Sequence, residues 1–268
     1  MDITLERPFA ASEKGKRINN EDCIFPLSEL ANPGQRLFMV CDGVGGAEKS
    51  EVASALACDS FRTYFSTFFK GNDPSEEFIN KAVHYAESRL DEYVLQHPEA
   101  QRMATTLTLL YIGESGITVA HIGDSRIYQF REGRIIYETE DHSFVQMLVN
   151  LGEITKEEAA VHPKKNIITR ALSGSVSSVN ADVAFIKDIR DGDVFLMCTD
   201  GVTECFTNEE LASLFSSGRS AEAIKDLLIE KCSEESKDNF SFYIIPVQSI
   251  QKIAGYKQYL FSFFYSFV

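Results

Sequence analysis

The sequence predicts an α+β fold in which two antiparallel β-sheets pack face to face, with helix layers on both sides and a small helical flap insert. The first observation is a run of strand-like segments at short intervals over residues 103–139, with Glu132-Gly133 as a hairpin turn. The second is that helical patterns flank the strands instead of alternating with them, as they would in a parallel doubly wound sheet.

The first half of the chain alternates short strands with two long helices. Residues 50–69 place apolar side chains at helical spacing, and Pro98 stops the helix that follows. Asp73-Pro74 is expected to supply the cap and the first position of that second helix. The expected elements are an edge strand or arm at 1–14, strands at 23–25 and 37–41, and helices at 50–69 and 74–97.

The second half is richer in strands and contains an insert. Thr155 to Glu158 form a capping box that opens a short helix. The insert separates two strand-rich regions, so we expect residues 141–172 to project from the sheets as a flap. The expected elements are strands at 103–112, 117–122, 125–131 and 134–139, the insert, strands at 183–186 and 194–198, helices at 207–215 and 220–232, and a strand at 240–247.

Composition and charge narrow the function classes. The 268 residues carry 26 basic and 40 acidic side chains, and the net charge of −14 argues against nucleic acid and anionic membranes as partners. Six cysteines without a C-x-x-C spacing fit a reducing compartment. The start of the chain has no signal-peptide pattern, and no stretch is long enough to span a bilayer. We therefore expect a cytoplasmic protein.

Four aspartates follow or precede apolar, strand-like runs. Asp42 and Asp200 each end such a run and are followed by glycine, Asp124 follows a third run, and Asp238 precedes the last strand. A single Asp-Gly pair is usually a turn, but this recurrence indicates a shared site. Carboxylates, together with the Gly43 carbonyl, suit Mg²⁺ or Mn²⁺. Zinc is not expected, because the cysteines and histidines are scattered.

Arg17 is the candidate cation for a phosphate group. Two adjacent divalent ions can activate a water toward phosphorus, and a guanidinium matches phosphate oxygens bidentately. Arg17 lies in one polar segment with Glu21 and Asp22. The alternative, a surface arginine paired with Glu21, stays open at this point.

An ordered set of short motifs resembles the metal-dependent serine/threonine protein phosphatases of type 2C, in their bacterial-like branch. The resemblance covers roughly residues 7–247. The motifs are Arg17-x-x-x-Glu21-Asp22, Asp42-Gly43-Val44-Gly45-Gly46, Ala104-Thr105-Thr106, Gly123-Asp124-Ser125-Arg126, Asp141-His142-Ser143, Gly152-Glu153-Ile154-Thr155, His162-Pro163-x-x-Asn166, Thr169-Arg170-Ala171-Leu172, Thr199-Asp200-Gly201 and Asp238-Asn239.

The resemblance implies a metal centre with two Mn²⁺ or Mg²⁺ ions. Asp42 would bridge them, with the Gly43 carbonyl on one. Asp200 and Asp238 would hold the first ion, and Asp124 would help Asp200 to hold a third, weakly bound metal.

The resemblance also implies roles for the residues around the metals. Arg17 would bind the substrate phosphate. Glu21 and Asp22 would orient waters, and Asn239 would orient Asp238.

The implied reaction is hydrolysis of phosphoserine and phosphothreonine in proteins by a metal-bridging hydroxide, without a phospho-enzyme. Its catalytic residues would be Arg17, Asp42 and Asp200. The expected partners are phosphorylated proteins, in opposition to a serine/threonine kinase. The alternatives are a catalytically silent phosphoprotein-binding scaffold of the same fold and a phosphatase for small molecules.

Two positions depart from the family pattern. Val44 stands where many eukaryotic members carry a histidine proposed as general acid, so the proton would come from elsewhere. A water on the third metal, near Asp124, could protonate the leaving oxygen. Ala104 replaces a common glycine, and we expect only a local packing change. Arg126 and His142 are expected to make structural contacts within the protein.

The catalytic domain is expected to span residues 1–248, followed by an aromatic extension over 249–268. The extension is expected to dock on the domain, and the alternative is a segment that contacts a partner protein or a membrane interface. Lys252 and Lys257 are the basic residues nearby, which makes membrane binding the weaker alternative.

Overall fold

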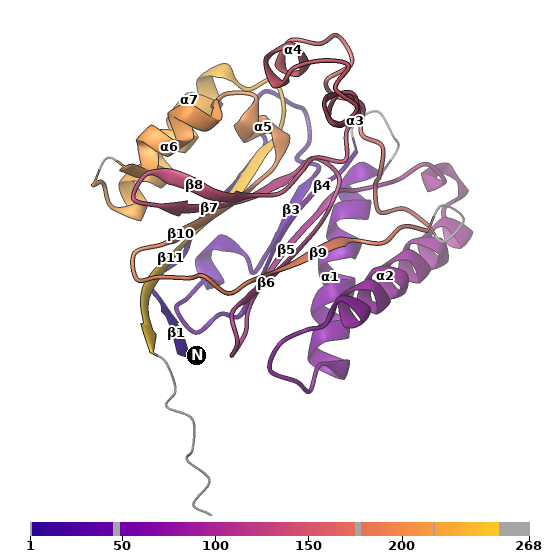
Figure 1. Ribbon diagram of the computed structural model, residues 1–268. Helices are drawn as coiled ribbons and strands as arrows, with labels where there is room; N and C mark the ends of the chain where they lie inside the picture. The colour runs from indigo at the N-terminus through magenta and orange to yellow at the C-terminus, as the bar shows by residue number, and fades with distance from the viewer. Residues whose placement is uncertain (1, 45–48, 175–177, 217, 252–268) are drawn as a thin grey trace, which may run out of the picture.

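Two antiparallel sheets stack face to face between helix layers in the computed structural model, which describes residues 2–44, 49–174, 178–216 and 218–251 (Figure 1). The predicted α+β sandwich is therefore confirmed. The aromatic extension beyond residue 251 lies outside the described residues.

The first sheet is organised around its longest strand, β11. The strand order is β1-β11-β10-β7-β8, and β2 also pairs with β11. β11 extends beyond the predicted 240–247 because its last residues pair with β1, as in the partners Ile3 and Ile250. The strands are β1 (Asp2–Leu5), β2 (Phe9–Glu13), β7 (Arg126–Arg131), β8 (Arg134–Glu138), β10 (Val194–Cys198) and β11 (Phe240–Gln251).

The second sheet has the order β3-β4-β5-β6-β9, with antiparallel pairs throughout. β5 is shorter than the predicted 103–112, because within residues 103–106 only Thr105 forms bridges, and these are isolated pairs with Gly43 and Leu172. The strands are β3 (Asp22–Phe25), β4 (Leu37–Asp42), β5 (Leu107–Ile112), β6 (Ile117–Ile122) and β9 (Asp182–Ile186).

Alternate residues of the central strands serve two different cores. In β4, Phe38 and Val40 pack between the sheets, whereas Met39 and Cys41 face the helices. The Phe38 ring meets that of Tyr243 on β11 edge to face, with centroids 5.2 Å apart. Period-two alternation places side chains on opposite faces, and both faces of these strands are covered, which is why they read as continuous apolar runs.

Helices cover both outer faces (Figure 1). α1 (Ser50–Phe68) and α2 (Glu76–Gln96) pack on the second sheet, and α6 (Asn208–Ser216) and α7 (Ala221–Glu235) pack on the first. The predicted cap of α2 was wrong: Ser75 Oγ accepts the Phe78 N–H at 3.1 Å, and Pro74 precedes the helix. None of the described helices has the length and apolarity needed to cross a membrane.

The predicted flap contains two short helices, α3 (Phe144–Asn150) and α4 (Lys156–Ala160), joined by loops. The Thr155 capping box is present. The flap returns to the body where Leu172 pairs with Thr105. Three short elements that the sequence did not predict are the 3₁₀ turns η1 (Ser28–Leu30) and η2 (Pro98–Ala100) and the helix α5 (Asp200–Thr203).

Candidate metal centre and phosphate site

Five aspartates from both sheets meet at one end of the sandwich. Asp42 is the last residue of β4, and its antiparallel partner in β3 is Asp22. Asp200 follows β10, Asp238 precedes β11, and Asp124 lies in the connection from β6 to β7. Each of the other four carboxylates contributes to raising the pKa of Asp42, as nearby negative charges do. The four aspartates predicted from the sequence thus converge, with Asp22 beside them.

Backbone and hydroxyl contacts fix Asp42 and the turn that follows it. The Thr106 hydroxyl accepts the Asp42 N–H at 3.0 Å, and the Thr106 N–H donates to the Asp42 carbonyl at 2.7 Å. Gly43 donates its N–H to the Glu21 carbonyl at 3.1 Å. A Cβ at position 43 would lie 2.5 Å from the Ser50 carbonyl oxygen, so only glycine fits this turn.

The cluster concentrates negative charge in a shielded site. Burial, together with the neighbouring carboxylates, raises the pKa of Asp42 well above its ordinary value. Burial is also the main cause that raises the pKa of Asp22 to about 7, of Asp124 to about 7 and of Asp200 to about 6. Ionising several carboxylates in such a cluster costs free energy, because they are buried and repel one another, and an added cation would offset this cost.

Two carboxylate oxygens in this cluster lack a protein partner. Oδ1 of Asp22 and Oδ1 of Asp200 are shielded from solvent, and neither finds a hydrogen-bond donor among the described residues. Buried polar atoms are rarely left unpaired in folded proteins. Mg²⁺ and Mn²⁺ prefer oxygen ligands of this kind, so the residues present suit the expected metals.

Arg17 lies at the rim of the cluster. Its Nη2 is 2.5 Å from Oδ2 of Asp238, and its side chain is 42% exposed. The alternative pairing with Glu21 is therefore not the ion pair that forms, although Arg17 lowers the pKa of Glu21 against the larger, opposite effect of burial. The guanidinium keeps further donors for an incoming anion.

The Asn239 side chain holds the segment that carries Arg17. Its Oδ1 accepts the Glu21 N–H at 2.9 Å, and its Nδ2 donates to the carbonyls of Lys14 and Asn19, each at 2.8 Å. The hydrogen bond from Asn239 to Asp238 comes from the backbone: the Asn239 N–H donates to Asp238 Oδ1 at 2.8 Å. The sequence offered no signal for this side-chain role, because the contacts join the two ends of the chain.

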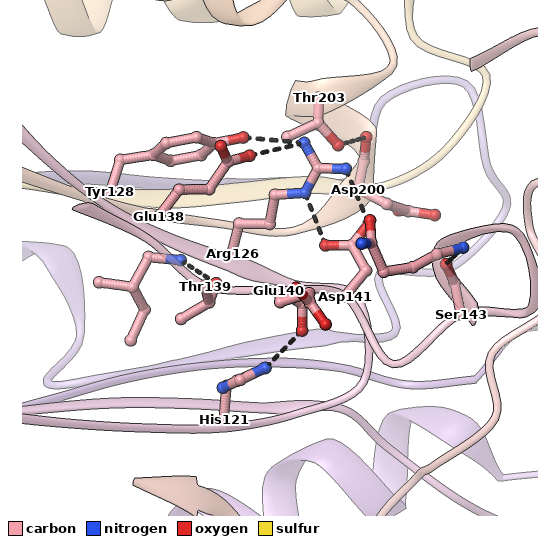
Figure 2. Close-up of polar contacts among 12 residues, drawn as sticks. His121, Arg126, Tyr128, Glu138, Thr139, Glu140, Asp141, Ser143, Asp200 and Thr203 are labelled. Atoms are coloured by element: carbon pink, nitrogen blue, oxygen red, sulfur yellow. Dashed lines mark hydrogen bonds and ion pairs between the residues drawn. The ribbon is translucent and has the colours of Figure 1, made fainter. Parts of the chain in front are cut away.

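Arg126 is held within the protein, as expected. Its Nε and Nη2 donate to the two Asp141 oxygens, each at 2.7 Å, and its Nη1 reaches Tyr128 at 3.0 Å and Glu138 at 3.4 Å. Figure 2 shows the guanidinium enclosed by these side chains. Because Asp141 opens the flap and Arg126 begins β7, this bidentate pair anchors the flap root beside Asp124.

His142 also makes structural contacts. Its Nδ1 accepts the Gly123 N–H at 3.1 Å, and Nε2 lies 3.2 Å from Asp182. The ring stacks on His121 with centroids 4.4 Å apart, and burial lowers the pKa of His142 to about 4. A ligand atom from His121, His142 and Asp182 could meet within 4.8 Å, but Arg170 already donates to both Asp182 oxygens, at 2.7 and 3.1 Å. These contacts favour a structural role for an uncharged His142, which joins the flap to β9, over a metal site.

A cleft of about 690 Å³ leads away from the aspartate cluster, between the flap and α6. Asp124 and Asp200 line it, together with Glu157 of α4, Glu204 after α5 and Glu209 of α6. The aspartate cluster thus lies at one end of a groove that the flap and α6 line.

Comparison with known proteins identifies the family. Residues 12–237 match the model of the family described as protein phosphatase 2C. The chain is 31% identical over 250 residues to the serine/threonine protein phosphatase PstP of Mycobacterium tuberculosis, covering 91% of this chain and 46% of that protein. The chain therefore spans about half the length of this relative.

Two further matches cover most of a relative and the whole of a solved catalytic domain. The serine/threonine phosphatase Stp of Listeria welshimeri is 31% identical over 223 residues, which are 81% of this chain and 87% of that protein. The crystal structure of the PstP catalytic domain in complex with two manganese ions is 31% identical, with a TM-score of 0.77 over 92% of this chain and 100% of that chain. The chain belongs to the protein phosphatase 2C family.

Proposed function

We propose that this chain is a metal-dependent phosphatase that hydrolyses phosphoserine and phosphothreonine in proteins. The observation that carries the proposal is the meeting of five aspartates at the end of the sandwich, with shielded, unpartnered oxygens on two of them. Relatives named as serine/threonine phosphatases, one of them solved with two manganese ions, support it.

The proposed metal ligands are the carboxylates of the cluster. Asp42, Asp200 and Asp238, with the Gly43 carbonyl, would hold two Mn²⁺ or Mg²⁺ ions. Asp124 would join Asp200 in holding a third, more weakly bound ion. When bound, the ions lower the pKa of a water molecule and neutralise phosphate charge.

The proposed role of Arg17 is to bind and orient the substrate phosphate. Its guanidinium has five N–H donors, and one terminal nitrogen is engaged with Asp238. The partly exposed position leaves the other donors facing solvent at the rim. Glu21 and Asp22 would order water around the ions, and Asn239 keeps the Arg17 segment in place through the contacts described above.

The Val44 side chain has no ionisable group, so another group has to supply the proton for the leaving oxygen. The Val44 N–H donates to the Ala104 carbonyl at 2.9 Å and is part of the turn. We assign proton delivery to water near Asp124, the aspartate that borders the cleft.

The biological setting belongs to the same proposal. The substrates would be phosphorylated proteins, in opposition to a serine/threonine kinase, in the cytoplasm. The catalytic domain, expected to span residues 1–248 with the flap at 141–172, would also include the end of β11 up to Gln251. The rest of the aromatic extension predicted at 249–268 would dock on it or contact a partner.

The test is phosphate release from a phosphothreonine peptide with Mn²⁺, with excess chelator, and with Asp200→Asn. We expect activity only in wild-type protein with metal. Undiminished activity in chelator would overturn the metal mechanism. Activity on small phosphate esters of metabolism but on no peptide would favour the small-molecule alternative, and Mn²⁺ binding without any hydrolysis would favour the silent scaffold.

A further inference from the structure

The cleft beside the aspartate cluster has an excess of negative charge. Eight carboxylates and three basic side chains line it in the described part of the chain. Two of the carboxylates, Asp124 and Asp200, belong to the proposed metal centre at its inner end. Asp200 carries the shielded Oδ1 without a protein partner, which ties that end of the cleft to a ligand.

Two of the three basic groups are paired with two of the eight carboxylates, which leaves six carboxylates and one lysine. Arg126 donates to both oxygens of Asp141 at 2.7 Å and is enclosed by the side chains around it (Figure 2). Lys165 Nζ lies 3.8 Å from Glu204 Oε1. Among the described lining residues, Lys156 is then the remaining basic group to set against the carboxylates of the walls.

Carboxylates stand on both walls of the cleft. Glu157 lies in the first turn of α4 on the flap, and Glu209 lies in the first turn of α6 across from it. Both are exposed, as is Glu140 at the root of the flap. A cation entering the groove therefore meets negative charge on two sides.

The same walls carry apolar surface. Val145 and Val149 of α3, Ala159 and Ala160 at the end of α4, and Phe206 line the cleft between the carboxylates. Long basic side chains place their methylene stems on apolar surface and keep the charged head near polar groups. A cleft lined by both carboxylates and apolar side chains thus suits the side chains of lysine and arginine.

We propose that this cleft binds lysine or arginine side chains that flank the phosphorylated residue of a protein substrate. The inference rests on the proposed function, since it places the phosphate at the aspartate cluster and the flanking residues between the flap and α6. A volume of about 690 Å³ exceeds what a phosphate needs and accommodates neighbouring side chains. The enzyme would therefore select phosphopeptides with basic flanks.

The expected preference is moderate and depends on salt. An exposed ion pair strengthens binding by up to about fivefold, so two such pairs are expected to lower KM on the order of tenfold. The effect should weaken as the ionic strength rises from about 0.05 M to about 0.5 M, because screening shortens the range of exposed charges.

The experiment compares phosphothreonine peptides that differ only in two flanking residues, Lys, Ala or Glu, placed before or after the phosphothreonine. Each is assayed with wild-type protein and with the double variant Glu157→Lys/Glu209→Lys. The matched control is Glu76→Lys/Glu222→Lys, which makes the same charge change at exposed positions in the first turns of α2 and α7, away from the cleft. p-Nitrophenyl phosphate serves as a substrate without flanks.

We expect wild-type protein and the control variant to show a KM for one of the Lys peptides about tenfold below that of the matching Glu peptide. The cleft variant should lose or reverse this order while its kcat/KM for p-nitrophenyl phosphate stays within about twofold. Equal KM values for all peptides in the wild type, or loss of the Lys preference in both double variants, would overturn this inference and leave the proposed function standing. Absence of hydrolysis of every phosphopeptide would overturn the proposed function itself.

Discussion

Replacing Asp200 by asparagine should stabilise the metal-free protein and remove its response to metal. Burial, and next the charge of Asp238, raises the pKa of Asp200 from 3.8 to about 6. One pKa unit corresponds to about 1.4 kcal/mol, so an ionised Asp200 lowers the free energy of unfolding by about 3 kcal/mol when no cation is bound. The substitution removes this cost.

The sign of the pH dependence follows from the direction of the shift. Because the pKa of Asp200 is higher in the folded than in the unfolded state, its protonated form contributes stability that is fully present below pH 3.8 and is lost as the pH rises through about 6. Asparagine does not titrate. The variant should therefore exceed metal-free wild type by about 1–3 kcal/mol at pH 8, with a smaller difference at pH 5.

The assay is urea unfolding followed by circular dichroism, at pH 5 and pH 8, with chelator and with Mn²⁺. A ligand at 100 times its Kd stabilises the folded state by about 2.7 kcal/mol, which wild type should gain at pH 8 and the variant should not. Asp226→Asn, at an exposed position on α7, is the isosteric control. A metal-free variant that is less stable than wild type at pH 8, or one that Mn²⁺ stabilises as strongly, would refute the reasoning.

Substitutions at three further positions test the phosphate site and the packing of the fold. Arg17→Ala should raise the KM for a phosphopeptide about 10- to 100-fold, because a charge-assisted hydrogen bond is lost, and Arg17→Lys should recover part of it in steady-state kinetics. Asp193→Ala should lower the free energy of unfolding by about 3–5 kcal/mol in urea titrations, because the fully buried Asp193 accepts the Arg131 Nε–H at 2.8 Å. Gly201→Ala should lower it by about 1–3 kcal/mol, since its Cβ would lie 2.0 Å from the Asn239 carbonyl oxygen.

Each of these expectations has a clear contrary result. An unchanged KM in Arg17→Ala would place the phosphate elsewhere. A loss below about 1 kcal/mol in Asp193→Ala would mean that its buried ion pair adds little to folding, and a neutral Gly201→Ala would mean that the turn after β10 shifts without cost.

The proposed metal ligands could be located from the sequence because strong local signals surround them. Apolar runs that end in aspartate and glycine mark Asp42 and Asp200 as strand-end residues, and the structure places both there. The two sheets followed from the same runs, since strands buried on both faces are apolar at every position. Once the two sheets stack face to face, the strand-end aspartates come together at the same end of the sandwich.

Contacts between distant segments could not be read from the sequence. The partner of Arg126 is Asp141, fifteen positions away, and the pairing depends on how the flap root returns to β7. The fully buried Asp193 gives no sequence signal, because an aspartate near a turn is ordinarily exposed. The cap of α2 was misassigned because Asp73 and Ser75 are both good capping residues, and Asp73 instead accepts the Ser115 N–H at 3.0 Å.

The most direct test of the metal centre is calorimetric titration of Mn²⁺ into metal-free protein at pH 7.5, with wild type and Asp42→Asn. Asp42 lies among the four other aspartates, and the related PstP catalytic domain is described with two manganese ions. We predict about two ions bound per wild-type chain, and a loss of at least one ion in the variant, or an affinity at least about 100-fold lower. Equal binding by both proteins, or none by wild type, would contradict the proposal that the strand-end aspartates form a metal centre.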